Sequence, residues 1–213
     1  MAILVTGGAG YIGSVAVDDL VESGQDVIVL DNLSRGHIEA VNENARFYQG
    51  DIGDREIVGR ICVENDVEAA MHFSAFAYVG ESVTDPLKYY RNNLAAPLSL
   101  LEAMQRHGCK RFIFSSTCAT YGDPVEMPMD ESHPQNPVNP YGASKLMLER
   151  VLKDCGRAWG LECVFLRYFN ASGCDPEGII GEDHDPETHL IPRILMAIRG
   201  EISIGTLFAF MAG

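Results

Sequence analysis

The sequence lacks any apolar run approaching the roughly 20 residues that are needed to cross a membrane. Its first residues, MAILVTGG, have no basic stretch before the apolar part, so we interpret them as a strand and not as a secretory signal. Basic residues are few: 16 lysines and arginines stand against 30 aspartates and glutamates, a net charge of −14. Nucleic acid is a poor partner for such a chain, because binding it depends on neutralising phosphates. We therefore expect neither a membrane protein nor a nucleic-acid binder.

Closely spaced cysteine pairs are also absent. The six cysteines are scattered at positions 62, 109, 118, 155, 163 and 174, and none forms a Cys-x-x-Cys pair. This pattern argues against a disulfide framework and against a zinc site, and it indicates reduced thiols in the cytoplasm. With 46% hydrophobic and 22% charged residues, the composition is that of an ordinary globular protein.

Short apolar runs alternate with longer helical stretches along most of the chain. The predicted strands are AILVT, DVIVLD, RFYQGD, EAAMHF, RFIFSS and ECVFLRYF, and the predicted helices are 10–23, 54–65, 86–107 and 141–159. Several strands are apolar on both faces, as expected when helices cover both sides of a parallel sheet. The alternation predicts an α/β fold with a doubly wound parallel sheet.

Two stretches interrupt this alternation. Residues 122–140 contain five prolines and are predicted to form a loop. Residues 174–189 carry six acidic residues and no basic one, and they include Asp183, His184, Asp185, Glu187 and His189. These are metal-ligating residue types, but their irregular spacing favours a solvated loop, so no metal site is expected.

A glycine-rich turn follows the first predicted strand. In LVTGGAGYIGS, Gly8, Gly10 and Gly13 satisfy G-x-G-x-x-G, and Thr6, Gly7, Gly10 and Gly13 satisfy T-G-x-x-G-x-x-G. The strand before it and the helix after it are the context that a dinucleotide-binding turn requires. Glycines there let backbone amides approach a pyrophosphate at the helix N-terminus. No G-K-[ST] sequence ends the turn, which disfavours a nucleoside-triphosphate loop.

Asp31 ends the second predicted strand, 18 residues after Gly13. A carboxylate at this place can accept hydrogen bonds from the ribose hydroxyls of an adenosine, and it would repel a 2′-phosphate. An aspartate that only shapes a turn would look the same in isolation. With the glycine turn upstream, Asp31 predicts NAD and not NADP.

The stretch NPYGASKLMLE places Tyr141 and Lys145 four residues apart at the start of a predicted helix. Residues at this spacing share a helix face, so the ammonium of Lys145 is expected near the phenol of Tyr141. A nearby cation favours the phenolate and lowers the pKa, which would let the tyrosine act as a base. The same spacing also occurs on helices where both residues are only solvated.

These motifs together resemble the extended short-chain dehydrogenase/reductase superfamily. The glycine turn, DNLSRGH, GDI, HFSAFAYVGES, YYRNN, FIFSSTCATYGDP, YGASK and RYFNASG occur in one order over residues 1 to about 204. Within that superfamily they are most similar to the UDP-glucose 4-epimerase family. The resemblance implies a Rossmann-type NAD-binding domain over 1–173 and, over 174–213, the start of a UDP-sugar-binding lobe, since family chains continue further.

The resemblance implies a catalytic role for three side chains. Tyr141 would be the base, Lys145 would also bind the nicotinamide ribose, and Thr117 would hydrogen-bond the sugar 4-oxygen. The implied activity interconverts UDP-glucose and UDP-galactose through a 4-keto sugar, with NAD as the bound hydride carrier. A positive nicotinamide near Tyr141 should lower the phenol pKa in the same way as Lys145.

Further contacts are implied by the same resemblance. Cofactor contacts are implied at Gly7, Gly10, Tyr11, Ile12, Gly13, Asp31, Asn32, Ser34, Arg35, Gly36, Asp51, Ile52, Phe73, Ser74, Ala75, Ala77, Asn92, Thr117, Tyr141, Lys145 and Phe169. Substrate contacts are implied at Thr117, Tyr141, Asn170, His189 and Leu190. Ala77 departs from family members that carry lysine there, which bears on subtype more than on function. A homodimer through helices 86–107 and 141–159 is also implied.

Several alternatives remain open at this stage. A 4,6-dehydratase would need an Asp-Glu pair after the threonine, where this chain has Cys118 and Ala119. A simple reductase would share Thr117, Tyr141 and Lys145 but would not need a UDP-binding loop around Asn170. The sugar could also be a UDP-N-acetylhexosamine or a UDP-pentose. Because TLFAFMAG resembles nothing in the family, a truncated NAD-binding chain with little or no activity is a further interpretation.

Overall fold

The computed structural model describes residues 1–184 and 187–206. The chain divides into two compact units, Met1–Ala171 and Ser172–Gly213, and each is described by itself below. The first unit holds the sheet and nearly all of the helices. Among the described residues, no helix has both the length and the apolar character to cross a membrane.

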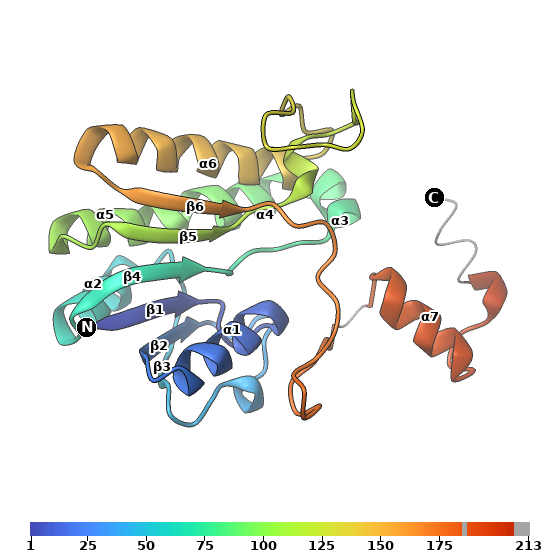
Figure 1. The fold of residues 1–213 in the computed structure, drawn as a ribbon, viewed down its shortest axis with the longest axis horizontal. Coiled ribbons are helices and arrows are strands. Elements are labelled where there is room, and N and C mark those ends of the chain that lie inside the picture. The colour runs from blue at the N-terminus through green and yellow to red at the C-terminus, as the bar shows by residue number, and fades with distance from the viewer. Residues whose placement is uncertain (185–186, 207–213) are drawn as a thin grey trace. The chain divides into compact units, whose positions relative to one another are not determined.

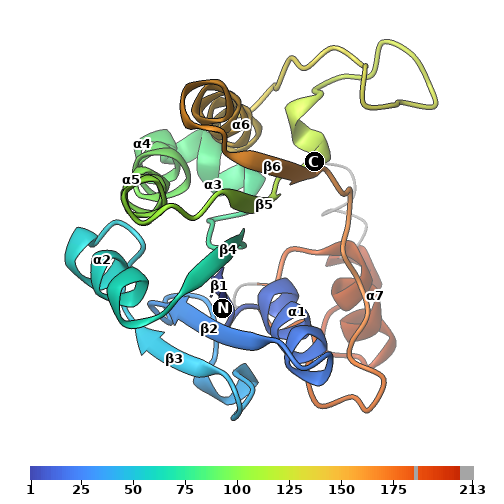
Figure 2. The same ribbon diagram turned by 60° about the vertical axis from the view of Figure 1, so that its left-hand side comes forward.

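Six parallel strands form one sheet in the order β3-β2-β1-β4-β5-β6. Their bounds are β1 Ala2–Thr6, β2 Asp26–Asp31, β3 Arg46–Gln49, β4 Val67–His72, β5 Arg111–Ser115 and β6 Glu162–Leu166. The strands lie side by side and point the same way, so all their carboxyl ends meet at one edge (Figures 1 and 2). The chain builds outward from β1 in both directions, and ligands bind at such a reversal of strand order. The predicted doubly wound parallel sheet is confirmed.

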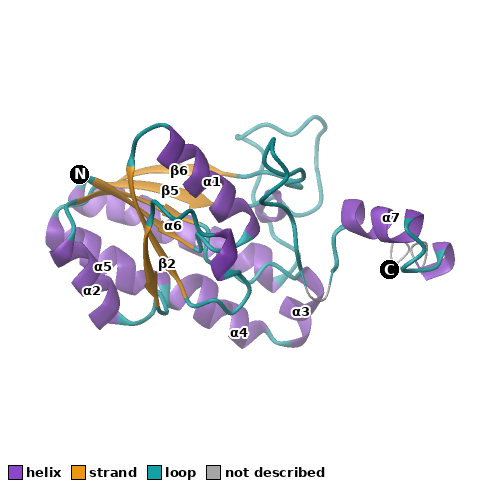
Figure 3. Ribbon diagram, turned by 90° about the horizontal axis from the view of Figure 1, so that it is seen from below, coloured by secondary structure: helices purple, strands orange, loops and turns teal. Residues whose placement is uncertain are grey.

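Alternation along the central strands sends their side chains to two different cores. Leu4, Ile28 and Leu30 join the larger core, whereas Val5 and Val29 join the smaller one. The larger core is completed by α2 (Arg55–Glu64), α5 (Pro97–His107) and α6 (Pro140–Trp159), and the smaller one by α1 (Tyr11–Glu22). Figure 3 shows α1 on one side of the strands and α2 with α5 on the other. Burial of this apolar surface is what holds the two helix layers on the sheet.

The helix ends follow local sequence signals. The side chain of Asn139 accepts a hydrogen bond from the Gly142 amide at 2.8 Å, and Pro140 occupies the first turn of α6. Gly160 then ends α6 with a φ of 78°. The remaining helices are α3 (Val79–Thr84), α4 (Pro86–Tyr90), the short η1 (Ile38–Ala40) and η3 (Cys118–Thr120), and α7 (Leu190–Ile198) in the second unit.

The helix predicted over 86–107 is not one regular α-helix. Between α4 and α5 lies η2 (Arg91–Ala95), a π-helical segment in which the Ala96 amide donates to the Arg91 carbonyl at 2.9 Å. Pro97, which follows, has no amide hydrogen to continue an α-helical ladder. The widened turn is a physical consequence of that proline, and such turns are frequent at functional sites. The predicted helical backbone is present over most of 86–107, interrupted by the π-helical turn.

Candidate dinucleotide pocket and tyrosine site

The carboxyl edge of the sheet carries an open pocket in the first unit. It is lined by the glycine turn after β1, by the segments after β2, β3 and β4, and by η2. The lining residues are Gly7, Gly10, Asp31, Asn32, Ser34, Arg35, Gly36, Gly50, Asp51, Ile52, Phe73, Ser74, Ala75, Phe76 and Asn92. All but Gly50 and Phe76 were predicted cofactor contacts. The segments that the sequence assigned to a dinucleotide thus come together in one concavity.

Glycines in the turn after β1 are required by close backbone approach. Gly7 has a φ of 78°, and a Cβ on it would lie 2.5 Å from the Ser74 amide nitrogen. A Cβ on Gly13 would overlap the carbonyl oxygen of Gly7. The turn therefore packs directly on the segment after β4 and on the start of α1. This leaves room for a phosphate-bearing ligand to approach backbone amides at the N-terminus of α1.

Asp31 links the glycine turn to the segment after β2. One carboxylate oxygen accepts from the Ala9 amide at 3.1 Å, and the other accepts from the Leu33 amide at 2.8 Å. Leu33 has a φ of 58°, unusual for a residue with a side chain. Each carboxylate oxygen has a further lone pair available for a hydroxyl. Asp31 therefore shapes the turn, which was the alternative to a ribose-binding role. It still presents an acceptor to the pocket.

Asn93 fixes the pocket wall after β4 and was not singled out from the sequence. Its side chain accepts from the Phe76 amide and donates to the Phe76 carbonyl, both at 2.9 Å, and it also donates to the Ser144 hydroxyl of α6 at 3.3 Å. The π-helical turn of η2 directs Asn93 into the core while its neighbour Asn92 lines the pocket. The only sequence signal was the Asn-Asn pair ahead of a proline in the helix.

Thr117 and Tyr141 meet beside the end of β5. Burial raises the pKa of the Tyr141 phenol to about 12, and the nearby hydroxyl of Thr117 offsets this rise only in part. The sequence-based prediction of a lowered pKa is therefore wrong for the chain's own residues, because burial removes the phenol from water and the neighbouring Tyr168 and Cys118 raise its pKa further.

Lys145 is buried one turn further along α6. Its ammonium donates to the Ser115 carbonyl at 2.8 Å and lies 4.9 Å from the Phe114 ring centre and 6.0 Å from that of Tyr141. Burial lowers the pKa of Lys145 to about 7. Burial, together with the charge of Lys145, also lowers the pKa of His72 to about 3, so this histidine is neutral. The predicted neighbours are thus together, in surroundings much drier than a solvated helix face.

A buried ion pair lies behind Thr117. Both oxygens of Glu149 accept from Arg167, from its Nε at 2.9 Å and its Nη2 at 2.7 Å, and Ser116 donates to the same carboxylate at 2.6 Å. Arg167 also donates to the Tyr121 hydroxyl at 3.0 Å. The network joins α6 to the ends of β5 and β6. The sequence analysis gave these residues no role. The signals that could have indicated an ion pair are a glutamate on the apolar face of α6 and an arginine directly after β6.

The other predicted site residues lie in several places. Tyr11 and Ile12 begin α1, whereas Ala77 and the exposed Phe169 and Asn170 lie in segments after β4 and β6. His189 and Leu190 belong to the second unit at the start of α7. There the imidazole of His189 contacts two glutamates and another histidine.

Comparison with known families gives a match over residues 3–207 to a model described as the NAD dependent epimerase/dehydratase family. Two curated relatives carry the name UDP-glucose 4-epimerase. One, from Streptococcus mutans serotype c, is 54% identical over 94% of this chain and 61% of its own length. The other, from Bacillus subtilis, is 45% identical over 97% of this chain and 62% of its own length. The chain thus spans about three fifths of the length of these relatives.

Solved structures show the same similarity. A UDP-glucose 4-epimerase from Brucella ovis, in complex with NAD, superposes with a TM-score of 0.93 at 50% identity, over 95% of this chain and 62% of that one. The enzyme of the same name from Bifidobacterium longum, in complex with NAD⁺ and UDP, gives a TM-score of 0.89 at 37% identity, over 95% of this chain and 64% of that one.

Proposed function

Because this chain belongs to the NAD dependent epimerase/dehydratase family, we propose that it is an NAD-dependent UDP-sugar 4-epimerase that interconverts UDP-glucose and UDP-galactose. The observation that carries the proposal is the Tyr141 ring 6.0 Å from the Lys145 ammonium, with Thr117 nearby, at the sheet edge that also bears the glycine-lined pocket. A positioned proton acceptor next to a dinucleotide pocket is what reversible oxidation of a sugar hydroxyl requires.

The pocket fits a dinucleotide. Its glycine lining is closely packed: a Cβ on Gly7 would lie 2.5 Å from the Ser74 amide nitrogen, and one on Gly36 would lie 2.5 Å from the Ala9 carbonyl oxygen. We assign the pyrophosphate to the glycine turn, the adenosine ribose to Asp31, and the nicotinamide ribose to Lys145. NAD, when bound there, supplies the acceptor and the donor of hydride.

Tyr141 is the proton-transferring group in this proposal. The phenolate would take the proton of the sugar 4-hydroxyl, and Thr117 would hold the same sugar oxygen through its hydroxyl. After the oxidised sugar has rotated in the site, the protonated phenol would return the proton to the sugar 4-oxygen. Since burial keeps the pKa of the free phenol near 12, Tyr141 is ready as an acid, and it needs an added positive charge nearby to act as a base.

Our assignment of the particular UDP-sugar goes beyond the family assignment and rests on the names of the relatives. The relatives are named for UDP-glucose, which favours a UDP-hexose over the N-acetylated or pentose forms for this chain. We propose that Asn170, His189 and Leu190 contact the UDP part. The exposed position of Asn170 after β6 agrees with a contact to a ligand in solution.

The experiment that tests this function is an assay of UDP-galactose conversion to UDP-glucose by the purified chain with added NAD, together with a direct measurement of NAD binding. Turnover with bound NAD supports the proposal. Bound NAD with no turnover would leave this chain as a dinucleotide-binding protein and would overturn the epimerase assignment. If NAD does not bind, the cofactor assignment fails as well.

We further propose that the chain forms a homodimer through the helices of 86–107 and 141–159. Leu87 of α4, Leu98 of α5 and Met147 of α6 are 60%, 39% and 43% exposed, so these helices present apolar side chains to solvent. Sedimentation of the wild type and of a Leu98→Glu, Met147→Glu variant tests it: the variant is expected to sediment as a monomer, and an unchanged mass would contradict the interface.

The cytoplasm is the proposed location. All six cysteines are free thiols, which is the usual state in a reducing compartment. The net charge of −14 likewise supports our proposal that nucleic acid is not a partner. Cell fractionation, with a retention assay on a nucleic-acid column, checks both statements.

A further inference from the structure

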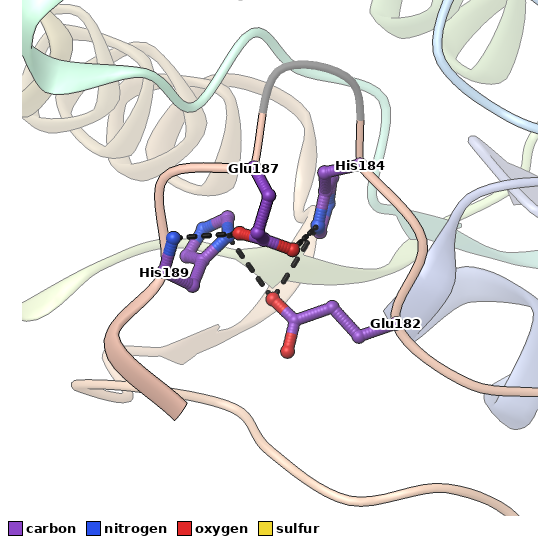
Figure 4. A group of neighbouring side chains, drawn as sticks. All are labelled: Glu182, His184, Glu187 and His189. Atoms are coloured by element: carbon purple, nitrogen blue, oxygen red, sulfur yellow. Dashed lines mark hydrogen bonds and ion pairs between the residues drawn. The ribbon is translucent and has the colours of Figure 1, made fainter. Parts of the chain in front are cut away.

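Four side chains converge in the second unit, ahead of α7: Glu182, His184, Glu187 and His189 (Figure 4). His189 Nδ1 lies 3.0 Å from Glu182 Oε1 and 2.9 Å from Glu187 Oε1. His184 Nδ1 lies 3.4 Å from Glu182 Oε1 and 3.7 Å from Glu187 Oε2. One donor atom from each residue falls within 4.8 Å of all the others. Two imidazoles and two carboxylates thus face a single point.

These separations agree with the dimensions of a tetrahedral metal site. Ligands placed 2.0–2.1 Å from zinc at the corners of a tetrahedron are about 3.3 Å apart. The imidazole–carboxylate separations run from 2.9 to 3.7 Å, with a different Glu187 oxygen nearest each histidine, and a set of one donor atom per residue lies within 4.8 Å. Imidazole nitrogen and carboxylate oxygen are both zinc ligands, and imidazole also suits other divalent transition metals.

Charge and burial in the cluster favour a cation. The side chains of Glu182 and Glu187 are only 10% exposed, and the imidazole of His184 is 23% exposed. With neutral imidazoles the cluster would carry two negative charges close together, a costly arrangement in partly dry surroundings. Residues 174–189 contain six acidic residues and no lysine or arginine, and Arg193 of α7 donates to the backbone carbonyl of Glu187 at 3.1 Å. A divalent ion would balance the two carboxylates.

The spacing argument against a metal site does not apply to this arrangement. Intervals of two, three and two residues separate the four donors. They match neither a helical nor a strand repeat, but donors on a loop can be directed inward without any regular spacing. Glu182, which completes the set, was not among the candidate residues considered from the sequence.

We propose that Glu182, His184, Glu187 and His189 bind one divalent transition-metal ion of the zinc class. Four protein ligands fill a tetrahedral shell, so the ion would have a structural and not a catalytic role. It would hold together the loop that leads into α7. The ion shares His189 with the proposed UDP contacts, but its binding needs neither NAD nor a sugar, so metal binding and epimerase activity are tested separately.

The test uses the full chain, stripped with a chelator, reduced and titrated with Co²⁺ as a spectroscopic probe. One equivalent is expected to give the intense visible bands of tetrahedral Co²⁺, without the near-ultraviolet thiolate band that cysteine ligation would add. Zn²⁺ should then displace the Co²⁺ and abolish the bands. A titration without tetrahedral bands, or one with a thiolate band, would overturn the proposal and leave the cluster as histidine–carboxylate contacts without a metal.

Matched variants locate the site. His184→Ala and Glu187→Gln are each expected to lower metal affinity at least about tenfold. Mutating a residue that only hydrogen-bonds to a metal ligand already causes a loss of that size. His107→Ala removes an exposed histidine in the last turn of α5, and Cys174→Ser removes the thiol nearest the cluster in sequence. Both controls should bind as the wild type does. Equal affinity in all variants would contradict the assignment, and the wild-type spectrum remains decisive if a variant does not fold.

Discussion

The ammonium nitrogen of Lys145 lies 6.0 Å from the centre of the Tyr141 ring, one turn along the same helix. Lys145 is buried and Tyr141 partly buried, and loss of water moves their pKa values in opposite directions, Tyr141 to about 12 and Lys145 to about 7. Each shift disfavours the charged form. The phenol is therefore protonated in the chain alone, and a positively charged ligand is needed to favour the phenolate.

Tyr141→Phe is expected to lower turnover about 10²- to 10⁴-fold, the usual contribution of a general acid–base group. NAD affinity should stay near the wild-type value, because the phenol hydroxyl transfers the proton and the pocket lining remains intact. Steady-state kinetics and NAD titration measure the two quantities separately. Tyr48→Phe is the matched control, since the Tyr48 hydroxyl bonds to Glu64 on the surface. Wild-type turnover in Tyr141→Phe would remove Tyr141 from the mechanism.

Lys145→Met is expected to stabilise the chain at pH 7 while impairing NAD binding. The folded pKa of Lys145, about 7, lies below the ordinary 10.5. Between these values the unfolded chain holds the proton and the folded chain does not, so this lysine makes stability rise with pH. The advantage of the Met variant should therefore shrink by about 2–3 kcal/mol from pH 7 to pH 9. Urea unfolding at both pH values measures this difference, and a constant gap between the two proteins would contradict it.

Much of the first unit follows from local sequence. The six apolar runs form the six strands, and the stretches 10–23, 54–65 and 141–159 form α1, α2 and α6 to within a residue or two. Cap residues and strong periodicity fix these elements locally. The π-helical turn at Arg91–Ala95 does not follow in the same way. It results from Pro97 together with the burial of Asn93, and that burial is known only once the fold is known.

What the sequence could not supply depends on burial and on loop shape. The spacing of Tyr141 and Lys145 predicts that they are neighbours but not that both are dry, so it gave the wrong direction for the tyrosine pKa. Likewise, the pairing of Glu149 with Arg167 joins positions 18 residues apart through tertiary packing. The convergence of Glu182 with His189 depends on an irregular loop that no periodic pattern describes.

Gly13→Ala is expected to disrupt the dinucleotide turn. The added methyl would overlap the Gly7 carbonyl oxygen, which is backbone and cannot rotate away. We expect NAD affinity to fall at least tenfold and the free energy of unfolding to fall by about 1–3 kcal/mol. The control is Gly59→Ala in α2, where a Cβ meets open space and the helix should gain up to about 1 kcal/mol. Isothermal titration with NAD and urea unfolding measure both effects, and unchanged affinity in Gly13→Ala would argue against a pyrophosphate at this turn.

Glu149→Gln breaks the buried ion pair with Arg167 and leaves the guanidinium without its carboxylate partner. Glu149 is fully buried, so the expected loss is about 3–5 kcal/mol of unfolding free energy at pH 7. Burial by itself would raise the pKa of Glu149, but the hydrogen bonds from Arg167 and Ser116 more than offset this and lower it.

The lowered pKa also sets a pH dependence for this pair. A carboxyl whose pKa is lower in the folded chain stabilises the fold above its ordinary pKa and loses that effect as pH falls through the folded value. The gap between the wild type and Glu149→Gln should therefore narrow in acid. Urea unfolding at pH 7 and pH 4 measures it, with Asp154→Asn as control, because the Asp154–Arg157 pair is exposed and worth at most about 1 kcal/mol. If both variants lost the same small amount, the Glu149–Arg167 pair would not hold α6 to the ends of β5 and β6, and Thr117 would owe its position to the sheet alone.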